Sequence, residues 1–329
     1  MNALGGPALY RDLDWRHIQQ NPLCFARTSS SELQYMCRVQ SIEIDDHIRG
    51  ECPRLSDPST RQTGTDMQFP ILRLNVGVRT KWMAPMPPAP VWPERCLSSA
   101  APFCPLMKGL TPSKVILRTP LWVSCPPTLG RLNQSRLEEL VVILDCGPRY
   151  WYAVTNLKSP LIGLRTQAKR CTVILLTDGP ETRIGGFKRY GEVAAWVENT
   201  CEGLAELALD QGSGGAVTVV NAGAIRPGDT GLDSKADHEV TQKRVVDLLQ
   251  LELARAKGRV VKADGCSRWK GSQDADRVRI VCINMATYLS TAESREDLSD
   301  EEISVWTERA EEQTKTLVHP EQTQQQLED

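Results

Sequence analysis

Two aspartates and one asparagine stand shortly after apolar runs that are typical of buried strands. Asp145 and Asp178 follow the first two of these runs, and Asn221 follows the third. Because ligands of open α/β sheets collect at the carboxyl ends of the strands, these three residues form a candidate binding edge whose oxygens could hold a divalent cation. The alternative is that Asp145 and Asp178 cap the turns after their strands. No third acid stands at a recognisable spacing, so we favour the capping role and assign no metal.

Three classes of enzyme could use parts of this pattern, and each lacks a necessary piece. Asn221-Ala-Gly223 is part of the Asn-Asn-Ala-Gly sequence of short-chain dehydrogenases, but the glycine-rich turn that admits a pyrophosphate and the Tyr-x-x-x-Lys pair are both missing. Leu144-Asp-Cys-Gly147 resembles a first methyltransferase motif without its further glycines. A nuclease of the RNase H type would need an aspartate where Asn221 stands. We therefore assign no catalytic residue, and a nucleotide- or NAD(P)-utilising enzyme, dehydrogenase-like or methyltransferase-like, is the alternative function.

The chain around these positions alternates between strand-like and helix-like patterns. Unbroken aliphatic runs predict buried strands, and apolar residues at steps of three and four predict amphipathic helices. The predicted strands are 140–144, 171–176, 216–220, 259–262 and 279–283. The predicted helices are 190–209 and 236–257, the second ending at Gly258, and residues 151–167 are weakly helical with a break at Pro160. Because parallel neighbours need a crossover, this order predicts an α/β fold with a mainly parallel sheet and helices on both faces, as in Rossmann-like proteins.

The predicted α/β domain covers residues 131–292, and the chain changes character on both sides of it. Of the 21 prolines, 16 lie at or before residue 127, and residues 83–93 are rich in proline. Residues 1–130 are therefore expected to be a largely disordered or irregular region rich in Pro, Cys and Arg, with extended pieces at 71–78 and 115–123. Residues 293–329 predict a charged, mainly solvated helix starting near Ser299, followed by a disordered tail.

Composition and charge narrow the classes of partner. The formal net charge of −2 gives no strong signal for nucleic acid, and no apolar run is long enough to predict a membrane span. No segment of signal-peptide type opens the sequence, which predicts an intracellular protein of the nucleus or cytoplasm. The 11 cysteines include no Cys-x-x-Cys pair, and their odd number predicts reduced thiols.

Two of the aliphatic runs carry a family resemblance. Asp145, Pro148 and Trp151 form an Asp-x-x-Pro-x-x-Trp pattern after the first run, and Thr177-Asp-Gly179 follows the second. Both resemble strand ends of divergent von Willebrand factor A-like domains, including members that act in meiosis and in transcription factor TFIIH. Residues 279–286 resemble a core strand of a member in the Integrator complex. The metal motif of that family, Asp-x-Ser-x-Ser, is replaced by Asp145, Gly147 and Arg149. The resemblance therefore implies a vWA-like fold that serves protein-protein scaffolding and not metal-dependent adhesion.

These observations together lead to one expected function. The absence of a complete catalytic set favours a non-enzymatic protein-protein interaction module or scaffold. Its expected partners are other proteins, and no cofactor is expected. The resemblance places such a module in an intracellular assembly of transcription, the cell cycle or meiosis.

Overall fold

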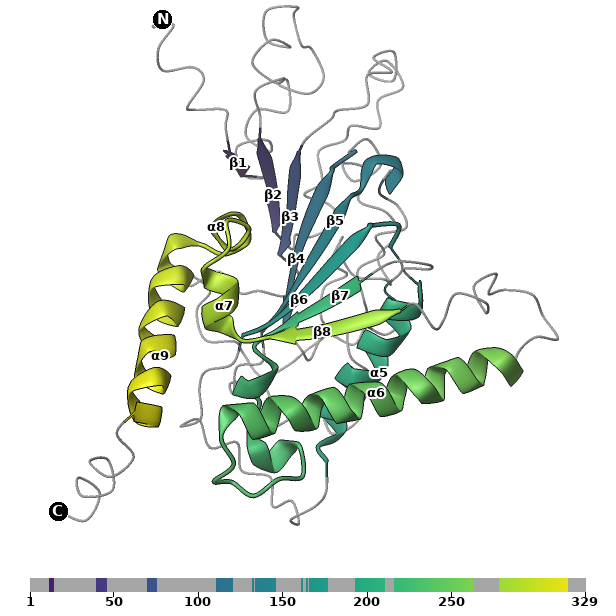
Figure 1. The fold of residues 1–329 in the computed structure, drawn as a ribbon. Coiled ribbons are helices and arrows are strands. Elements are labelled where there is room, and N and C mark those ends of the chain that lie inside the picture. Colours follow the sequence, from purple (N-terminus) through teal and green to yellow (C-terminus); the bar gives the residue numbers. More distant parts are fainter. Residues whose placement is uncertain are drawn as a thin grey trace, which may run out of the picture.

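The chain folds around one parallel sheet. The computed structural model describes residues 12–14, 40–45, 70–75, 111–120, 132, 134–145, 161, 164, 166–176, 193–210, 216–262 and 278–318. The strands in this part are β1 (Asp12–Asp14), β2 (Ser41–Asp45), β3 (Ile71–Asn75), β4 (Lys114–Pro120), β5 (Glu139–Asp145), β6 (Arg170–Leu176), β7 (Ala216–Val220) and β8 (Arg279–Ile283). They lie side by side in their order along the chain, and every neighbouring pair is parallel (Figure 1).

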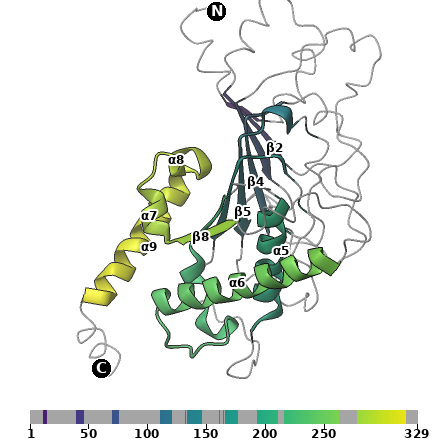
Figure 2. The ribbon, with the colours of Figure 1, turned by 45° about the vertical axis from the view of Figure 1, so that its right-hand side comes forward.

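The helices divide between the two faces of the sheet. The longer elements are α5 (Ala195–Asp210), α6 (His238–Lys262), α7 (Met285–Leu289), α8 (Ser294–Asp297) and α9 (Asp300–Val318), with short 3₁₀ turns at Gln134–Arg136, Ala222–Ala224 and Pro227–Asp229. Helices α5 and α6 lie on one side of the sheet, and α7 to α9 lie on the other (Figure 2). The predicted α/β fold, with a parallel sheet and helices on both faces, is confirmed.

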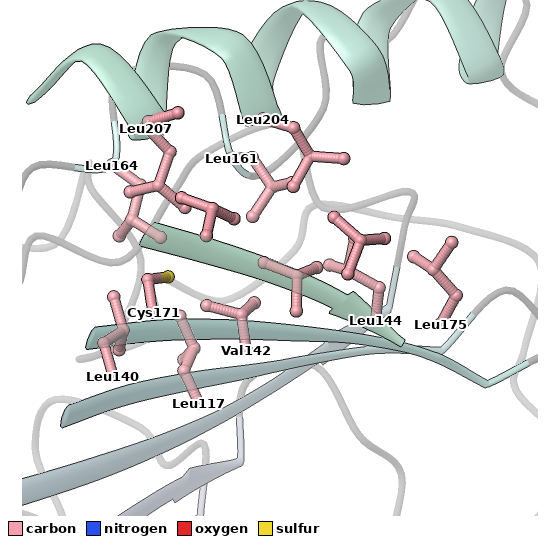
Figure 3. Packing of buried hydrophobic residues seen from close by; sticks show 14 of the residues in the cluster. Leu117, Leu140, Val142, Leu144, Leu161, Leu164, Cys171, Leu175, Leu204 and Leu207 are labelled. Carbon is pink, nitrogen blue, oxygen red and sulfur yellow. The ribbon is translucent and has the colours of Figure 1, made fainter. Parts of the chain in front are cut away.

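The first face of the sheet carries the larger core. Along β5, Leu140, Val142 and Leu144 point to this face, because side chains alternate along a strand. Leu204 and Leu207 of α5 pack against them (Figure 3). Helix α5 joins β6 to β7 and α6 joins β7 to β8, and crossovers of one hand between successive strands fall on the same face. The strand order therefore explains why both crossover helices cover this face.

The second face is covered by the segment that follows β8. The alternate residues of β5, Val141 and Ile143, belong to a separate cluster that contains Met285 of α7 and Trp306 of α9. Only 6% of the Trp306 surface is exposed, so α9 is docked on the sheet. The other side chains described between Asp300 and Ala310 are exposed or half-buried, so the contact of α9 with the sheet is confined to one edge of the helix. The expected helix start is correct, because Ser299 and Glu302 form a capping box in which each accepts from the other's backbone N–H.

Several predicted boundaries can be compared with the structure. The strands predicted at 216–220 and 279–283 coincide with β7 and β8, and the extended pieces near 71 and 115 are the sheet strands β3 and β4. The predicted domain start at residue 131 falls between β4 and β5, which pair from Lys114 to Pro120. The strand predicted at 259–262 is wrong, because these residues continue α6 through Gly258. A glycine inside an exposed helix costs only about 1 kcal/mol, which the packing of α6 offsets.

No helix in the described part of the chain is both long enough and apolar enough to span a bilayer.

Candidate functional site

Asn221 has a structural task at the carboxyl end of the sheet. Its backbone is left-handed, with φ 69° and ψ 27°, and its N–H donates to the carbonyl of Ile283 at 2.9 Å. Its buried side-chain amide donates to the carbonyl of Leu175, also at 2.9 Å. The residue thus joins the ends of β6, β7 and β8. An amide nitrogen used in this way is turned toward the sheet backbone and away from a ligand.

The two predicted aspartates lie on neighbouring strands or close to them. Asp145 is the last residue of β5, and its register partner on β6 is Leu176. Asp178 lies outside the described residues, two positions beyond that partner. Strands β5 and β6 are adjacent and parallel, so their carboxyl ends share one edge of the sheet. The pairing of Asp145 with Asp178 in a common site stays a prediction.

The strand order removes the usual ligand crevice from this edge. Open α/β sheets bind ligands where the order of strands reverses, because the crossovers on either side of that point diverge to opposite faces. In the described part of the chain the strands run from β1 to β8 without a reversal. The carboxyl edge of the described sheet therefore lacks the crevice that usually makes such edges binding sites.

A groove of about 600 Å³ opens on the second face, between strands β2 to β4 and the helices α8 and α9. Its floor is apolar and is shared by the sheet and the helices. The apolar lining residues are Ile116, Ile143, Leu298, Val305 and Trp306. Val305 is 40% exposed, so it is accessible from the groove, whereas Trp306 is almost completely buried. The volume is within the range of ordinary ligand pockets.

Side chains on the strand wall of the groove are held by hydrogen bonds, both to one another and to the helices. Arg118 of β4 holds Glu302 of α9 through two bonds, Nη1 to Oε1 at 2.5 Å and Nη2 to Oε2 at 2.7 Å. Asn75 of β3 donates to Glu43 of β2 at 2.6 Å. Arg73 donates to a backbone carbonyl of α8 at 2.5 Å. Strand side chains therefore fix the position of the helices that form the other wall.

A buried charge network lies at the amino end of the same face. The Lys114 Nζ is 2.6 Å from Oδ1 of Asp297, 3.1 Å from Oε2 of Glu296 and 3.6 Å from Oε2 of Glu139. Tyr288 donates its hydroxyl to the second carboxylate oxygen of Asp297. Asp297 is only 2% exposed, and Lys114 is also buried. The network joins β4 and β5 to α7 and α8.

The pKa values of this network follow from burial and from its pairs. Burial alone would lower the pKa of Lys114, but Asp297 and the other carboxylates raise it above its ordinary value. Burial raises the pKa of Asp297, against the opposing effect of Lys114 and Tyr288. Burial also raises the pKa of Tyr288, with the Asp297 carboxylate adding to the effect. The phenol therefore stays protonated and acts as a donor.

One carboxylate of the groove wall, that of Glu302, has a pKa below its ordinary value. Burial alone would raise the pKa of Glu302, but the Arg118 guanidinium and the hydrogen bonds from Ser299 outweigh it and lower that pKa. Glu302 is thus ionised over the neutral range and committed to Arg118. A general base must be able to reach a substrate proton, and this carboxylate is already bound on both oxygens.

The described part of the chain holds few groups that are suited to covalent catalysis or to metal binding. It contains no group of three or more His, Cys, Asp or Glu residues placed to hold a metal ion. Its cysteines are free thiols: Cys171 and Cys201 are buried, and Cys282 is half-buried. Burial raises the pKa of the first two thiols to about 12 and that of Cys282 to about 11. These thiols are therefore protonated, and the thiolate is the reactive form.

The groove was missed because its charged residues lie in segments outside the predicted domain. A signal for it does exist in the sequence. Lys114, Ile116 and Arg118 alternate with the apolar residues of β4, which indicates that one face of this strand is partly polar. The acidic start of α9, Asp300 to Glu302, supplies the matching charges.

Comparison of the chain with protein-family models, with curated proteins and with solved structures finds no match. A function has therefore to be inferred from the geometry of the groove and of the sheet around it.

Proposed function

We propose that the protein is a non-enzymatic protein-protein interaction module that acts as a scaffold in an intracellular assembly, and that the groove beside α9 is a surface that binds a partner. The observation that carries the proposal is a groove of about 600 Å³ with an apolar floor, in which Arg118 is paired with Glu302 and Asn75 with Glu43. Such a surface can exclude water from an apolar side chain. The carboxylate of Glu302 is committed to Arg118 and is not available as a general base.

The rim of the groove indicates the chemistry of the partner. Among the lining residues, Arg73 and Arg118 are basic, whereas Glu43, Asp297, Glu301 and Glu302 are acidic. Glu43 and Glu301 are the exposed members of this set, and they stand on opposite walls, one on β2 and one on α9. Charge complementarity therefore favours a partner segment that inserts an aliphatic or aromatic side chain and carries Lys or Arg beside it.

Selection of displayed random peptides on the full-length protein would test this proposal. We expect enriched peptides to combine one apolar anchor with neighbouring basic residues. Val305→Asp should weaken their binding by at least about tenfold, because it places a charge on the apolar floor. Val240→Asp is the matched control, because Val240 is 47% exposed on α6, which lies across the sheet from the groove. It should leave binding unchanged.

Two results would count against the proposal. Peptides that bind both aspartate variants equally well would show that the groove is not their site. Saturable binding of NAD, ATP or S-adenosylmethionine in calorimetry, lost in Val305→Asp, would support the alternative of a nucleotide-utilising enzyme.

A further inference from the structure

Within the described part of the chain, strand β8 is an edge of the sheet. It pairs with β7 on one side, and it has no second partner strand within the described part of the chain. Figure 1 shows it at the margin of the sheet, with α6 below it and α7 leading away from its end. An edge strand presents a row of backbone N–H and C=O groups to any segment that approaches in extended form.

The side chains of β8 give this edge little protection. Its sequence is Arg-Ile-Val-Cys-Ile, with one charge at its first position. Val281, in the middle of the strand, is 46% exposed, and Arg279 is exposed as well. Natural edge strands usually carry inward-pointing charges, prolines or bulges that prevent pairing. An edge with an exposed aliphatic residue at its centre is suited to receive another strand.

Arg279 is the last position in a row of register partners that crosses the sheet, and Ala216 separates it from the three charges of that row. The register aligns Lys114, Glu139, Arg170, Ala216 and Arg279 on five neighbouring strands. Glu139 lies 3.6 Å from Lys114 and 3.3 Å from Arg170, so the first three charges alternate and are paired. Arg279 makes no ion pair with any residue that the structure places. The next position in this row, beside Arg279, is where a carboxylate would pair with this last cation.

We propose that β8 binds an extended segment of a partner protein, which adds a further strand to the sheet and places an acidic residue beside Arg279 and an aliphatic residue beside Val281. The backbone edge supplies the hydrogen bonds, and the two side chains supply the selectivity, as in other cases of strand addition. This surface is separate from the groove beside α9, and the proposal does not depend on it.

A second copy of the chain fits this edge less well. A closed dimer would pair the two β8 strands antiparallel about a twofold axis. If this pairing is centred on Val281, Arg279 lies opposite Ile283 of the other copy. The Arg279 side chain then has no acidic partner. The charge at the edge therefore favours a different, acidic segment.

Fluorescence anisotropy with the full-length protein can test this proposal. The probe is a labelled peptide with the core Val-Thr-Glu-Thr-Val, and the matched probe has Lys in place of Glu. We expect the Glu probe to bind about two- to fivefold more tightly, as for an exposed ion pair. Arg279→Glu should reverse this preference, which a loss of folding could not do. Val281→Lys should abolish binding of both probes, and Val240→Lys should not.

N-methylation tests the role of the backbone. A Glu probe methylated on alternate amides should not bind, because it cannot pair with the strand edge. Three results would overturn the proposal: equal binding of the methylated probe, no saturable binding of either probe, or an unchanged preference in Arg279→Glu. Concentration-dependent dimerisation that Val281→Lys abolishes, measured by sedimentation, would assign the edge to a second copy and would overturn it too.

Discussion

Replacement of Lys114 by methionine should separate the helices of the second face from the sheet. The substitution keeps an unbranched side chain of similar length and removes the cation that lies 2.6 Å from Asp297. Asp297 is then left 2% exposed with a single donor, Tyr288. Breaking one side of a buried ion pair costs about 3 to 5 kcal/mol. We expect the lower end of this range, because the Tyr288 hydroxyl stays in place.

A double-mutant cycle makes this prediction sharper. Asp297→Asn should cost less, about 1 to 3 kcal/mol, because Lys114 keeps Glu139 and Glu296 as partners and the amide oxygen can still accept from Tyr288. In the double variant no buried carboxylate is left at residue 297, and Glu139 keeps Arg170 at 3.3 Å. The cost of the double variant should therefore fall below the sum of the two single costs by about 2 kcal/mol.

The pH dependence of the Lys114→Met variant follows from the same contacts. Lys114 is one of the groups that lower the pKa of Asp297, so its removal raises that pKa further above the ordinary value. An acid whose pKa is raised by folding destabilises the fold when ionised, and this loss disappears as the pH falls through the raised pKa. The difference in unfolding free energy between the wild type and the variant should therefore become smaller as the pH falls.

Urea unfolding followed by circular dichroism, at neutral and mildly acidic pH, gives the free energies for this cycle. Hydrogen exchange should locate the change, with faster exchange in α7 to α9 and little change in α5. Additive costs in the cycle, or an equal loss at both pH values, would refute the assignment of Lys114 and Asp297 as a coupled pair. Faster exchange that is confined to α5 and α6 would refute the role of the pair in docking the second-face helices.

Five further variants test local features of the fold. Glu302→Gln should lower the free energy of unfolding by about 1 to 2 kcal/mol at neutral pH. This difference from the wild type should vanish as the pH falls through the lowered pKa of Glu302, which urea unfolding across the acidic range can measure. Asn221→Ala should lower the free energy of unfolding by about 2 to 3 kcal/mol, and Asn221→Gly should lower it by less. Glycine keeps the left-handed backbone and loses only the side-chain hydrogen bond, so an equal cost of the two variants would contradict this. Gly223→Ala should lower the melting temperature, because the new Cβ would lie 2.6 Å from the carbonyl oxygen of His238. Gly258→Ala should raise the melting temperature, because its Cβ would meet no atom within 4 Å and the substitution removes a glycine from a helix.

The strands of the sheet could be predicted from the sequence because each is a local pattern. Residues 216–220 are an aliphatic run enclosed by Gly215 and Asn221, and β7 has these bounds. The error at 259–262 has the same origin. Val260 and Val261 favour a strand by propensity, but the helix before them continues, and the position beside β7 is taken by β8. Tertiary context decided between two conformations that the local sequence leaves open.

The groove could not be predicted, because it joins segments far apart in the chain. Arg118 and Glu302 are separated by 184 positions, and no local pattern relates them. The packing of Trp306 depends in the same way on Ile143, which lies on a central strand. The candidate edge was derived from a rule about strand ends, and the rule holds where the strand order reverses. That order is a property of the whole chain.

The strand order also explains where the two proposed binding surfaces lie. When strands follow one another without reversal, the crossover helices collect on one face, and the other face must be covered by a segment from outside the repeat. Here α7 to α9 perform this task, held by Lys114 and Arg118. They cover the middle of the sheet, leaving a groove where α9 meets β2 to β4 and an uncovered strand at β8. The groove is therefore a consequence of a cover that is smaller than the sheet beneath it, whereas the edge at β8 follows from its place as the last strand. A variant that detaches α9 should abolish binding in the groove while strand addition at β8 persists.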